Sequence, residues 1–181
     1  MSTLEGSLAA QSLERLAAWD RALCVRCNGV SHVRGLRRAF VAVSRMGDGW
    51  FWYALMAAIL IVDGMRAAGA VVHMIVVGLT CTVLYKSIKA LTSRPRPYAA
   101  DPGITLCAAP LDQYSFPSGH TLHATAFTLV ALSYYPALFW LLLPFSMLVA
   151  LSRVVLGLHY PSDVLAGALI GAIVAGLSAQ L

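Results

Sequence analysis

Five long apolar stretches, separated by short polar segments, constrain this chain more than any other feature of its sequence. They cover residues 50–68, 70–85, 120–135, 137–151 and 164–181. A helix needs about 20 residues to cross the roughly 30 Å hydrocarbon core of a bilayer, and each stretch is near that length or slightly short. The chain of 181 residues is 59% hydrophobic and only 12% charged, with a mean hydropathy of +0.74. We therefore expect an all-α integral membrane protein, a helical bundle with about five transmembrane helices.

The segment before these stretches, residues 1–48, is both amphipathic and basic. Its apolar side chains recur at roughly helical spacing, at Leu8, Leu13, Leu16, Ala17 and Trp19. Charged residues interrupt any spanning run, and residues 32–46 repeat the pattern with four arginines. The segment has no feature of a removable signal peptide, so we expect insertion to depend on an internal helix. We expect interfacial helices here, with an amphipathic pair packed on the body of the protein as the alternative.

The net charge of +5 raises the question of which anionic partner the chain meets. A basic chain can bind nucleic acid, but seven of the 13 cationic residues are arginines before Trp50, and five more lie in the polar motifs described below. Cations that lie beside membrane helices are placed to bind the anionic headgroups of lipids. We therefore expect the lipid bilayer as partner and no binding of nucleic acid, and the sequence indicates no oligomeric state.

Residues 152–163, between the last two apolar stretches, place a cation, an imidazole and a carboxylate at fixed intervals. Asp163 follows His159 by four residues, so its carboxylate can accept a hydrogen bond from one ring nitrogen and leave the other nitrogen free to attack or to exchange a proton. Arg153 offers a planar fork of donors that suits phosphate oxygens. Taken alone, the same residues could be a capping pair at a helix start and an arginine that extends to the membrane interface.

A second polar motif follows the second apolar stretch, over residues 89–97. A helix that carries Lys86 and Lys89 should end here, because Pro95 and Pro97 cannot continue it. Cations therefore collect at one membrane face, together with Arg96. On its own, this motif could be an ordinary set of positive residues flanking a membrane helix.

A third motif, residues 116–120, directly precedes the third apolar stretch. Ser118 is a candidate N-cap of the helix, and Gly119 allows a ligand to approach the backbone closely. The unpaired amides at a helix start bind anions, and His120 in the first turn could donate a proton to a bound phosphate. His123 lies one turn further on, and packing is the favoured interpretation for this histidine.

Together, the three motifs resemble the type 2 phosphatidic acid phosphatase family, whose signature is K-x6-RP, PSGH and SR-x5-H-x3-D. Every signature position matches, in the family's order, over roughly residues 86–163. The matching residues are Lys89, Arg96 and Pro97, then Pro117 to His120, then Ser152, Arg153, His159 and Asp163. Residues 44–49 also look like the start of the family's first core helix, which is a much weaker similarity.

The resemblance implies a membrane enzyme that removes phosphate from a lipid phosphate or pyrophosphate through a covalent phosphohistidine, without a metal or other cofactor. It implies His159 as the nucleophile, Asp163 as its orienting carboxylate and His120 as the acid that protonates the leaving oxygen. The phosphate-binding groups that it implies are Lys89, Arg96, Ser118, Gly119 and Arg153. Residues 49–181 would form the catalytic domain, with residues 1–48 as the interfacial segment.

Several functions remain open at the level of sequence. Phosphatidate, phosphatidylglycerophosphate, a polyprenyl phosphate or pyrophosphate, and a lipid A phosphate are all candidate substrates. A lipid phosphotransferase would use the same phosphohistidine, and a lipid carrier or scaffold would use the fold without catalysis. The related vanadate-dependent haloperoxidases share this kind of anion pocket, but that resemblance fits a soluble chain.

Alternating crossings by five helices would bring the three motifs to one side of the membrane. The first motif follows the second stretch, the next opens the third stretch, and the last joins the fourth stretch to the fifth. Residues 1–48 and their seven arginines fall on the same side, so the positive-inside rule favours the cytoplasmic face. The resemblance favours the opposite face, because many bacterial relatives act on the outer side. We expect a multi-pass protein of the cytoplasmic (inner) membrane with its site facing the cytoplasm.

Overall fold

The computed structural model describes residues 2–180, and for residues 2–10, 12 and 13 it describes the backbone alone. The side chains of Leu8 and Leu13, which we expected on an apolar face, therefore lie outside the described residues. Eight α-helices, with short 3-10 and π turns between several of them, make up this part of the chain. They are α1 (Ser2–Gly29), α2 (Arg34–Arg45), α3 (Phe51–Asp63), α4 (Ala68–Thr92), α5 (Pro97–Ala100), α6 (Gly119–Tyr134), α7 (Phe139–Val155) and α8 (Pro161–Ser178). The all-α prediction is confirmed.

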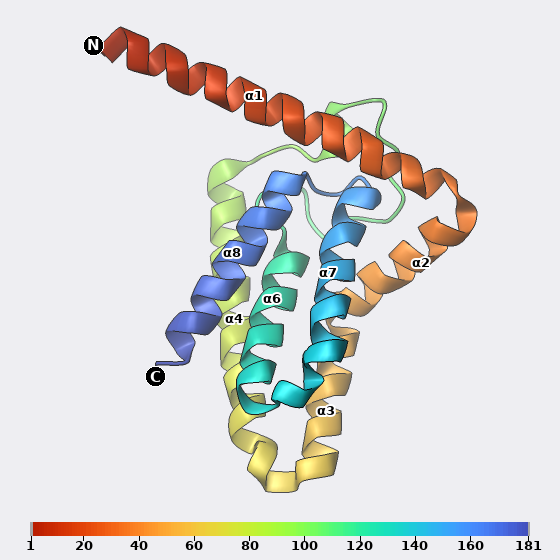
Figure 1. The fold of residues 1–181 in the computed structure, drawn as a ribbon, viewed down its shortest axis with the longest axis vertical. Helices are drawn as coiled ribbons and strands as arrows, with labels where there is room; N and C mark the ends of the chain where they lie inside the picture. The colour runs from red at the N-terminus through yellow and green to blue at the C-terminus, as the bar shows by residue number, and fades with distance from the viewer. Residues whose placement is uncertain (1, 181) are drawn as a thin grey trace.

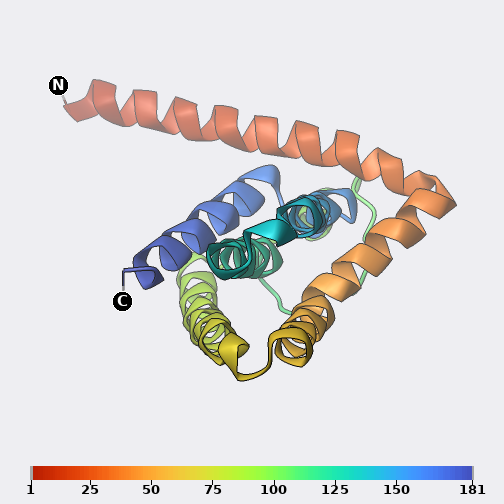
Figure 2. The same cartoon turned by 60° about the horizontal axis from the view of Figure 1, so that its bottom comes forward.

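The bundle is formed by α3, α4, α6, α7 and α8, with α6 surrounded by its neighbours (Figures 1 and 2). Ten of the 16 residues of α6 are buried, from Gly119 to Ala131. Large apolar side chains are instead exposed on the outer helices, including Ile61 in α3, Val72 in α4, Trp140 in α7 and Leu165 in α8. An exposed apolar belt around a helical bundle is what a bilayer requires of its solute.

Each of the five apolar stretches forms one of these bundle helices, but the helices extend into the polar motifs. Helix α4 continues past residue 85 to Thr92, and α7 continues past residue 151 to Val155. The reason is that Lys89 and Arg153 point into the protein, where they are 5% and 2% exposed and contact polar groups. Neither charge faces the lipid, so each helix can continue through its cation.

Three helical segments are long and apolar enough to cross a membrane, over residues 34–100, 136–155 and 161–178. The first contains both α3 and α4, which run in opposite directions from a turn at one end of the bundle (Figure 1). The central helix α6 has 16 residues, fewer than the roughly 20 that a full crossing needs.

Two glycines of α8, Gly167 and Gly171, bring it close to α6, because small residues four positions apart let two helices approach closely. A Cβ atom on Gly167 would lie 2.6 Å from the Ser118 carbonyl oxygen, and one on Gly171 would meet the Leu122 carbonyl oxygen. The start of α8 is therefore held against the start of α6, where the Ser118 amide donates to the Asp163 carbonyl oxygen at 3.0 Å.

Helix α1 lies across the end of the bundle where α7 ends and α8 begins (Figures 1 and 2). The face that it turns to the bundle is mixed, with Asp20, Cys24 and Asn28 buried at four-residue spacing. Cys24 belongs to a small apolar cluster with Ile104 and Val154. Leu16 and Trp19 are about half exposed, at 48% and 47%. The two large apolar side chains thus lie outside the contact that Asp20, Cys24 and Asn28 make with the bundle.

Candidate active site

The three motifs meet at the α1 end of the bundle, around one cavity of about 370 Å³. Six of the eight predicted site residues line it, namely Lys89, Arg96, Gly119, His120, Arg153 and His159. The other two, Ser118 and Asp163, are completely buried and do not line it. Apolar side chains of α3 and α4 continue the cavity wall away from the motifs, including Trp52, Met56, Ile75 and Leu79. The cavity therefore has a cationic end and an apolar end.

Two of the cations are held by a carboxylate that sequence reasoning missed. The Lys89 ammonium donates to both Asp112 oxygens, at 2.6 and 2.8 Å, and Arg96 donates to one of them at 2.7 Å. Burial alone would raise the pKa of Asp112, but the contacts with Lys89 and Arg96 outweigh it and lower that pKa below its ordinary value. Asp112 is therefore ionised and holds both cations at the cavity wall. A lone aspartate in a loop gave no sequence signal for this pairing.

The third cation, Arg153, has a different environment. Its side chain is buried and donates one hydrogen bond to the Ser44 hydroxyl group. Among the described residues, no acceptor lies within hydrogen-bond distance of its Nε atom, and no carboxylate forms an ion pair with it. A buried, uncompensated guanidinium group is costly, and binding of an anion in the cavity would remove that cost.

His159 is 1% exposed and lies between a cation and a carboxylate. Arg96 donates toward its Nε2 atom at 3.2 Å, so we assign the ring proton to Nδ1. Burial, Arg153 and Arg96 lower the pKa of His159 well below its ordinary value. The imidazole is therefore neutral, with a lone pair on the nitrogen that faces the cations.

The expected hydrogen bond between His159 and Asp163 is replaced by a longer contact. The Nδ1 atom lies 3.6 Å from Asp163 Oδ2, beyond hydrogen-bond distance, and has no other partner among the described residues. The reason is that both carboxylate oxygens are already engaged. Oδ1 accepts from Arg94 at 2.6 Å, and Oδ2 accepts from the Tyr160 amide at 2.8 Å. Asp163 thus acts on the imidazole through its charge at this separation.

The start of α6 supplies the backbone amides of the third motif. Ser118 is the N-cap, as predicted, and its hydroxyl group accepts from the Thr121 amide at 3.5 Å. This geometry turns the hydroxyl group toward Thr121 and away from the cavity wall. Gly119 does line the cavity, with the Tyr85 ring 3.3 Å from the position that a Cβ atom would take.

His120 faces the cavity and is paired with Asp48, which the sequence analysis did not assign to the site. Asp48 lies between two glycines, and Gly49 has a φ of 130°, which glycine adopts far more readily than other residues. That turn carries the carboxylate to the Nε2 atom of His120. The Gly-Asp-Gly sequence was the available signal, but nothing in it indicates a histidine as the partner.

His123 packs, as we expected, although its ring also borders the cavity. Its Nδ1 atom lies 2.9 Å from the Gly119 carbonyl oxygen, and its Nε2 atom lies 3.1 Å from the Thr82 hydroxyl group. Both ring nitrogens are thus engaged within the protein. His123 is therefore a matched control for the two site histidines.

Comparison with known proteins identifies the same family that the three motifs indicate. Residues 66–181 match the PAP2 superfamily. The chain is 31% identical over 159 residues to an undecaprenyl-diphosphatase of Sulfolobus acidocaldarius, with 87% of this chain and 74% of the relative covered. It is 39% identical over 173 residues to a decaprenylphosphoryl-5-phosphoribose phosphatase of Mycobacterium tuberculosis, with 90% and 85% covered.

A solved structure shows the same fold. It is the crystal structure of a transmembrane PAP2 type phosphatidylglycerolphosphate phosphatase from Bacillus subtilis, with a TM-score of 0.74 and 24% sequence identity. The likeness covers 92% of this chain and 85% of that one. At this identity, it is evidence for the shared fold alone.

Proposed function

This chain belongs to the PAP2 superfamily and is a lipid phosphatase, and from this premise we propose that it hydrolyses a prenyl phosphate or diphosphate through phospho-His159. The observation that carries the proposal is the buried Arg153 guanidinium, which lacks a carboxylate partner among the described residues and faces the same cavity as His159. The prenyl class is favoured because the two relatives described above are named for prenyl lipids.

Phosphate would bind at the cationic end of the cavity. Lys89, Arg96 and Arg153 carry three positive charges there, and Asp112 contributes one negative charge. The net charge of these four groups is +2, which suits a phosphate dianion. The Gly119 amide at the start of α6 adds a hydrogen-bond donor. Because these groups are held before substrate arrives, they can also stabilise the charge of the transition state.

The reaction has two steps. First, the His159 Nε2 lone pair attacks phosphorus, the bond to the leaving oxygen breaks, and His120 gives that oxygen a proton. Then water attacks the phosphohistidine, His120 takes a proton from the water, and the P–N bond breaks to release inorganic phosphate. Asp163 stabilises the positive imidazole in between. The charges that stabilise phosphate come from side chains, so we propose that turnover needs no metal.

The apolar end of the cavity would hold the first part of the lipid tail. Ile75 and Leu79 line the cavity and are 47% and 64% exposed on the outer side of α4. The cavity therefore borders the surface that we assign to lipid, between α3 and α4. A phosphorylated headgroup could reach the cations while its hydrocarbon chain remains in the bilayer.

Phosphate release from a panel of lipids tests the proposal. The purified full-length chain, in detergent with EDTA, is given undecaprenyl diphosphate, undecaprenyl phosphate, phosphatidylglycerophosphate and phosphatidate, beside His159→Ala as a control. We expect the fastest release from a prenyl substrate. Faster release from a glycerolipid would reject the prenyl class, loss of activity in EDTA would reject metal independence, and a phosphorylated lipid product would indicate phosphotransfer.

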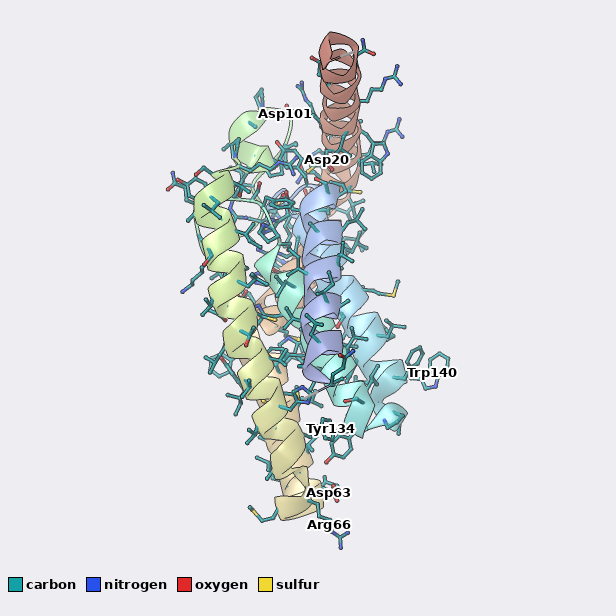
Figure 3. All side chains as sticks on the ribbon, turned by 90° about the vertical axis from the view of Figure 1, so that its left-hand side faces the viewer. Asp20, Asp63, Arg66, Asp101, Tyr134 and Trp140 are labelled. Atoms are coloured by element: carbon teal, nitrogen blue, oxygen red, sulfur yellow. The ribbon has the colours of Figure 1, made fainter. Side chains whose placement is uncertain are left out.

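We propose that the protein spans the cytoplasmic membrane and that its site lies on the cytoplasmic side. Asp20 and Asp101 lie at the α1 end of the molecule, and Asp63 and Arg66 lie at the opposite end (Figure 3). The seven arginines before Trp50 belong to the segment that includes α1 and α2, whereas Arg66 is on the turn at the far end. This distribution follows the positive-inside rule.

Thiol labelling tests the orientation. Cys27 and Cys107 are partly exposed near the site, whereas Cys24 and Cys81 are buried. A membrane-impermeant maleimide should label Cys107 in a Cys27→Ser variant only after the cells are opened. Labelling of intact cells would show that the site faces outward.

A further inference from the structure

Asp20 of α1 is a buried carboxylate that reaches the catalytic motif from far away in the sequence. It is 1% exposed, and its Oδ2 atom accepts a hydrogen bond from Arg94 at 2.9 Å. The other guanidinium nitrogen of Arg94 donates to Asp163 at 2.6 Å. Asp20, Arg94 and Asp163 thus form a continuous carboxylate–arginine–carboxylate chain that ends beside His159.

The Arg94 guanidinium is fixed in position by further contacts. It donates to the Ser162 hydroxyl group at 2.8 Å and lies over the Tyr160 ring, 4.2 Å from its centre. A planar guanidinium held on several sides is a rigid bridge between two carboxylates. The position of Asp163 therefore depends on Arg94, and the position of Arg94 depends on Asp20.

The charges of the chain give Asp20 a second effect. Arg94 neutralises Asp163, so these two residues alone would leave little negative charge to stabilise a positive imidazole at His159. Asp20 adds a second carboxylate, and the three groups together carry one net negative charge. That charge is matched to the single positive charge that His159 acquires when it bonds to phosphorus.

We propose that Asp20 and Arg94 are positioning residues for the nucleophile, and that α1 is therefore a functional part of the active site. The inference rests on the proposed function, in which His159 attacks phosphorus. Asp20 lies outside the three motifs, Arg94 lies within the second motif but not at a signature position, and neither residue lines the cavity. They act on His159 by positioning Asp163 and by setting the net charge of the three groups, without touching the reacting atoms.

A purely structural role is the alternative interpretation. Asp20 also accepts a hydrogen bond from the Ser162 amide at 2.9 Å, and thus serves as an acceptor for the first turn of α8. An acceptor of this kind would affect the stability of the fold and leave the catalytic constant of folded protein unchanged. The two roles therefore predict different kinetics.

A neighbouring ion pair provides a matched control. Arg21 of α1 donates to Asp101 at 2.5 Å and connects the same helix to the loop after α5. Among the described residues, neither member of this pair forms a hydrogen bond or an ion pair with Asp163 or Arg94. Arg21→Gln therefore removes one tether of α1 and leaves the carboxylate–arginine–carboxylate chain complete.

The experiment compares Asp20→Asn, Arg94→Gln, the double variant and Arg21→Gln, all as full-length chains. We expect Asp20→Asn to lower kcat about tenfold with little change in KM, less than the loss expected for an orienting carboxylate that touches the histidine. The double variant should lose less than the product of the two single losses, because its remaining Asp163 restores one negative charge. Arg21→Gln should retain wild-type kcat. Wild-type kcat in Asp20→Asn, or independent losses in the double variant, would overturn the inference.

Binding of orthovanadate separates this inference from the proposed function, because it needs no lipid turnover. Vanadate adopts the geometry of a phosphate under attack, so its affinity, measured by calorimetry, reports the placement of His159. We expect binding about tenfold weaker in Asp20→Asn than in Arg21→Gln, in line with kcat. If no lipid is hydrolysed, this difference still supports the positioning role. Equal affinity, or no binding to any variant, would overturn it.

Discussion

The cavity brings together two histidine–carboxylate pairs, and they are built in different ways. His159 and Asp163 lie four residues apart, both at most 1% exposed, and the carboxylate is held by an arginine and a backbone amide. His120 meets Asp48 across 72 positions of sequence, and the Asp48 side chain is 31% exposed and lines the cavity. The first pair is thus local, and we call it sealed because Asp163 does not line the cavity although His159 does. The second is assembled by the fold, and we call it open because both members line the cavity.

This difference matches the two kinds of chemistry that we propose. A nucleophile must be neutral and fixed, and burial beside Arg153 and Arg96 keeps His159 in that state. An acid that later acts as a base must exchange its proton first with a leaving oxygen and then with water. Such a group has to face the cavity, as His120 and Asp48 do. Substitutions in each pair can test this difference.

The largest effect is expected from His159→Ala, because the variant removes the atom that forms the bond to phosphorus. Turnover should fall by at least about 10⁴-fold, and labelling of the protein by a ³²P-labelled substrate should disappear. His123→Ala, which removes a packed histidine from the same cavity wall, should keep most of the activity and all of the labelling. Labelling that persists in His159→Ala would assign the nucleophile elsewhere.

The next effect concerns the carboxylate of the sealed pair. Asp163→Asn should lower kcat by about 10² to 10⁴-fold, by analogy with orienting carboxylates of catalytic triads. The amide can still accept from the Tyr160 backbone, but it loses the charge that supports the imidazole and pairs with Arg94. Thermal unfolding of the same sample checks that the fold is intact. Near-wild-type kcat would reduce Asp163 to a cap of α8.

The open pair should give a smaller and more selective loss. Asp48→Asn should slow turnover about tenfold for substrates with poor leaving groups, because the imidazolium form of His120 loses its partner. Substrates with good leaving groups need little protonation, so their rates of phosphoenzyme formation should change little. Burst kinetics on aryl phosphates that differ in leaving-group pKa measure this dependence. An equal loss for every leaving group would assign Asp48 to structure.

The same contrast separates what could be predicted from the sequence and what could not. Apolar stretches of bilayer length predicted the five bundle helices, because hydrophobic burial depends on composition over many residues. The pairing of His159 and Asp163 could be predicted because they are only four residues apart, with His159 just before the N-cap of α8 and Asp163 in its first turn. The cations of the three motifs could be predicted as functional, because a charged residue between membrane-spanning stretches destabilises the protein unless it binds a partner or a ligand.

The partners of those motif residues were not predictable, because tertiary structure brings them together. Asp112 pairs with Lys89 from 23 residues away, Asp48 with His120 from 72, and Asp20 with Arg94 from 74. Helical periodicity in α1 drew attention to Leu16 and Trp19, yet the side chains that α1 buries against the bundle are Asp20, Cys24 and Asn28. A single sequence contains no signal for which aspartate meets which cation.

The smallest effect is a pH dependence that should be nearly absent. A histidine with an ordinary pKa near 6.5 would be about 90% protonated at pH 5.5 and would lose nucleophilicity accordingly. Burial and the nearby arginines lower the pKa of His159 well below that value, so the neutral form persists as the pH falls. Phosphoenzyme formation should therefore fall by no more than about twofold as the pH is lowered from 7.5 to 5.5.

The ionisation of the substrate has to be separated from that of the enzyme. A phosphate monoester takes up a proton near pH 6, and this can imitate the titration of a histidine. Rapid-quench measurements with a prenyl monophosphate and a prenyl diphosphate distinguish the two, because a titrating enzyme group gives both substrates the same midpoint. A rate that rises as the pH falls would report protonation of His120. A shared midpoint near pH 6.5 with a rate that falls as the pH falls would mean that His159 is accessible and ordinary, and the sealed pair would then be as open as the pair formed by His120 and Asp48.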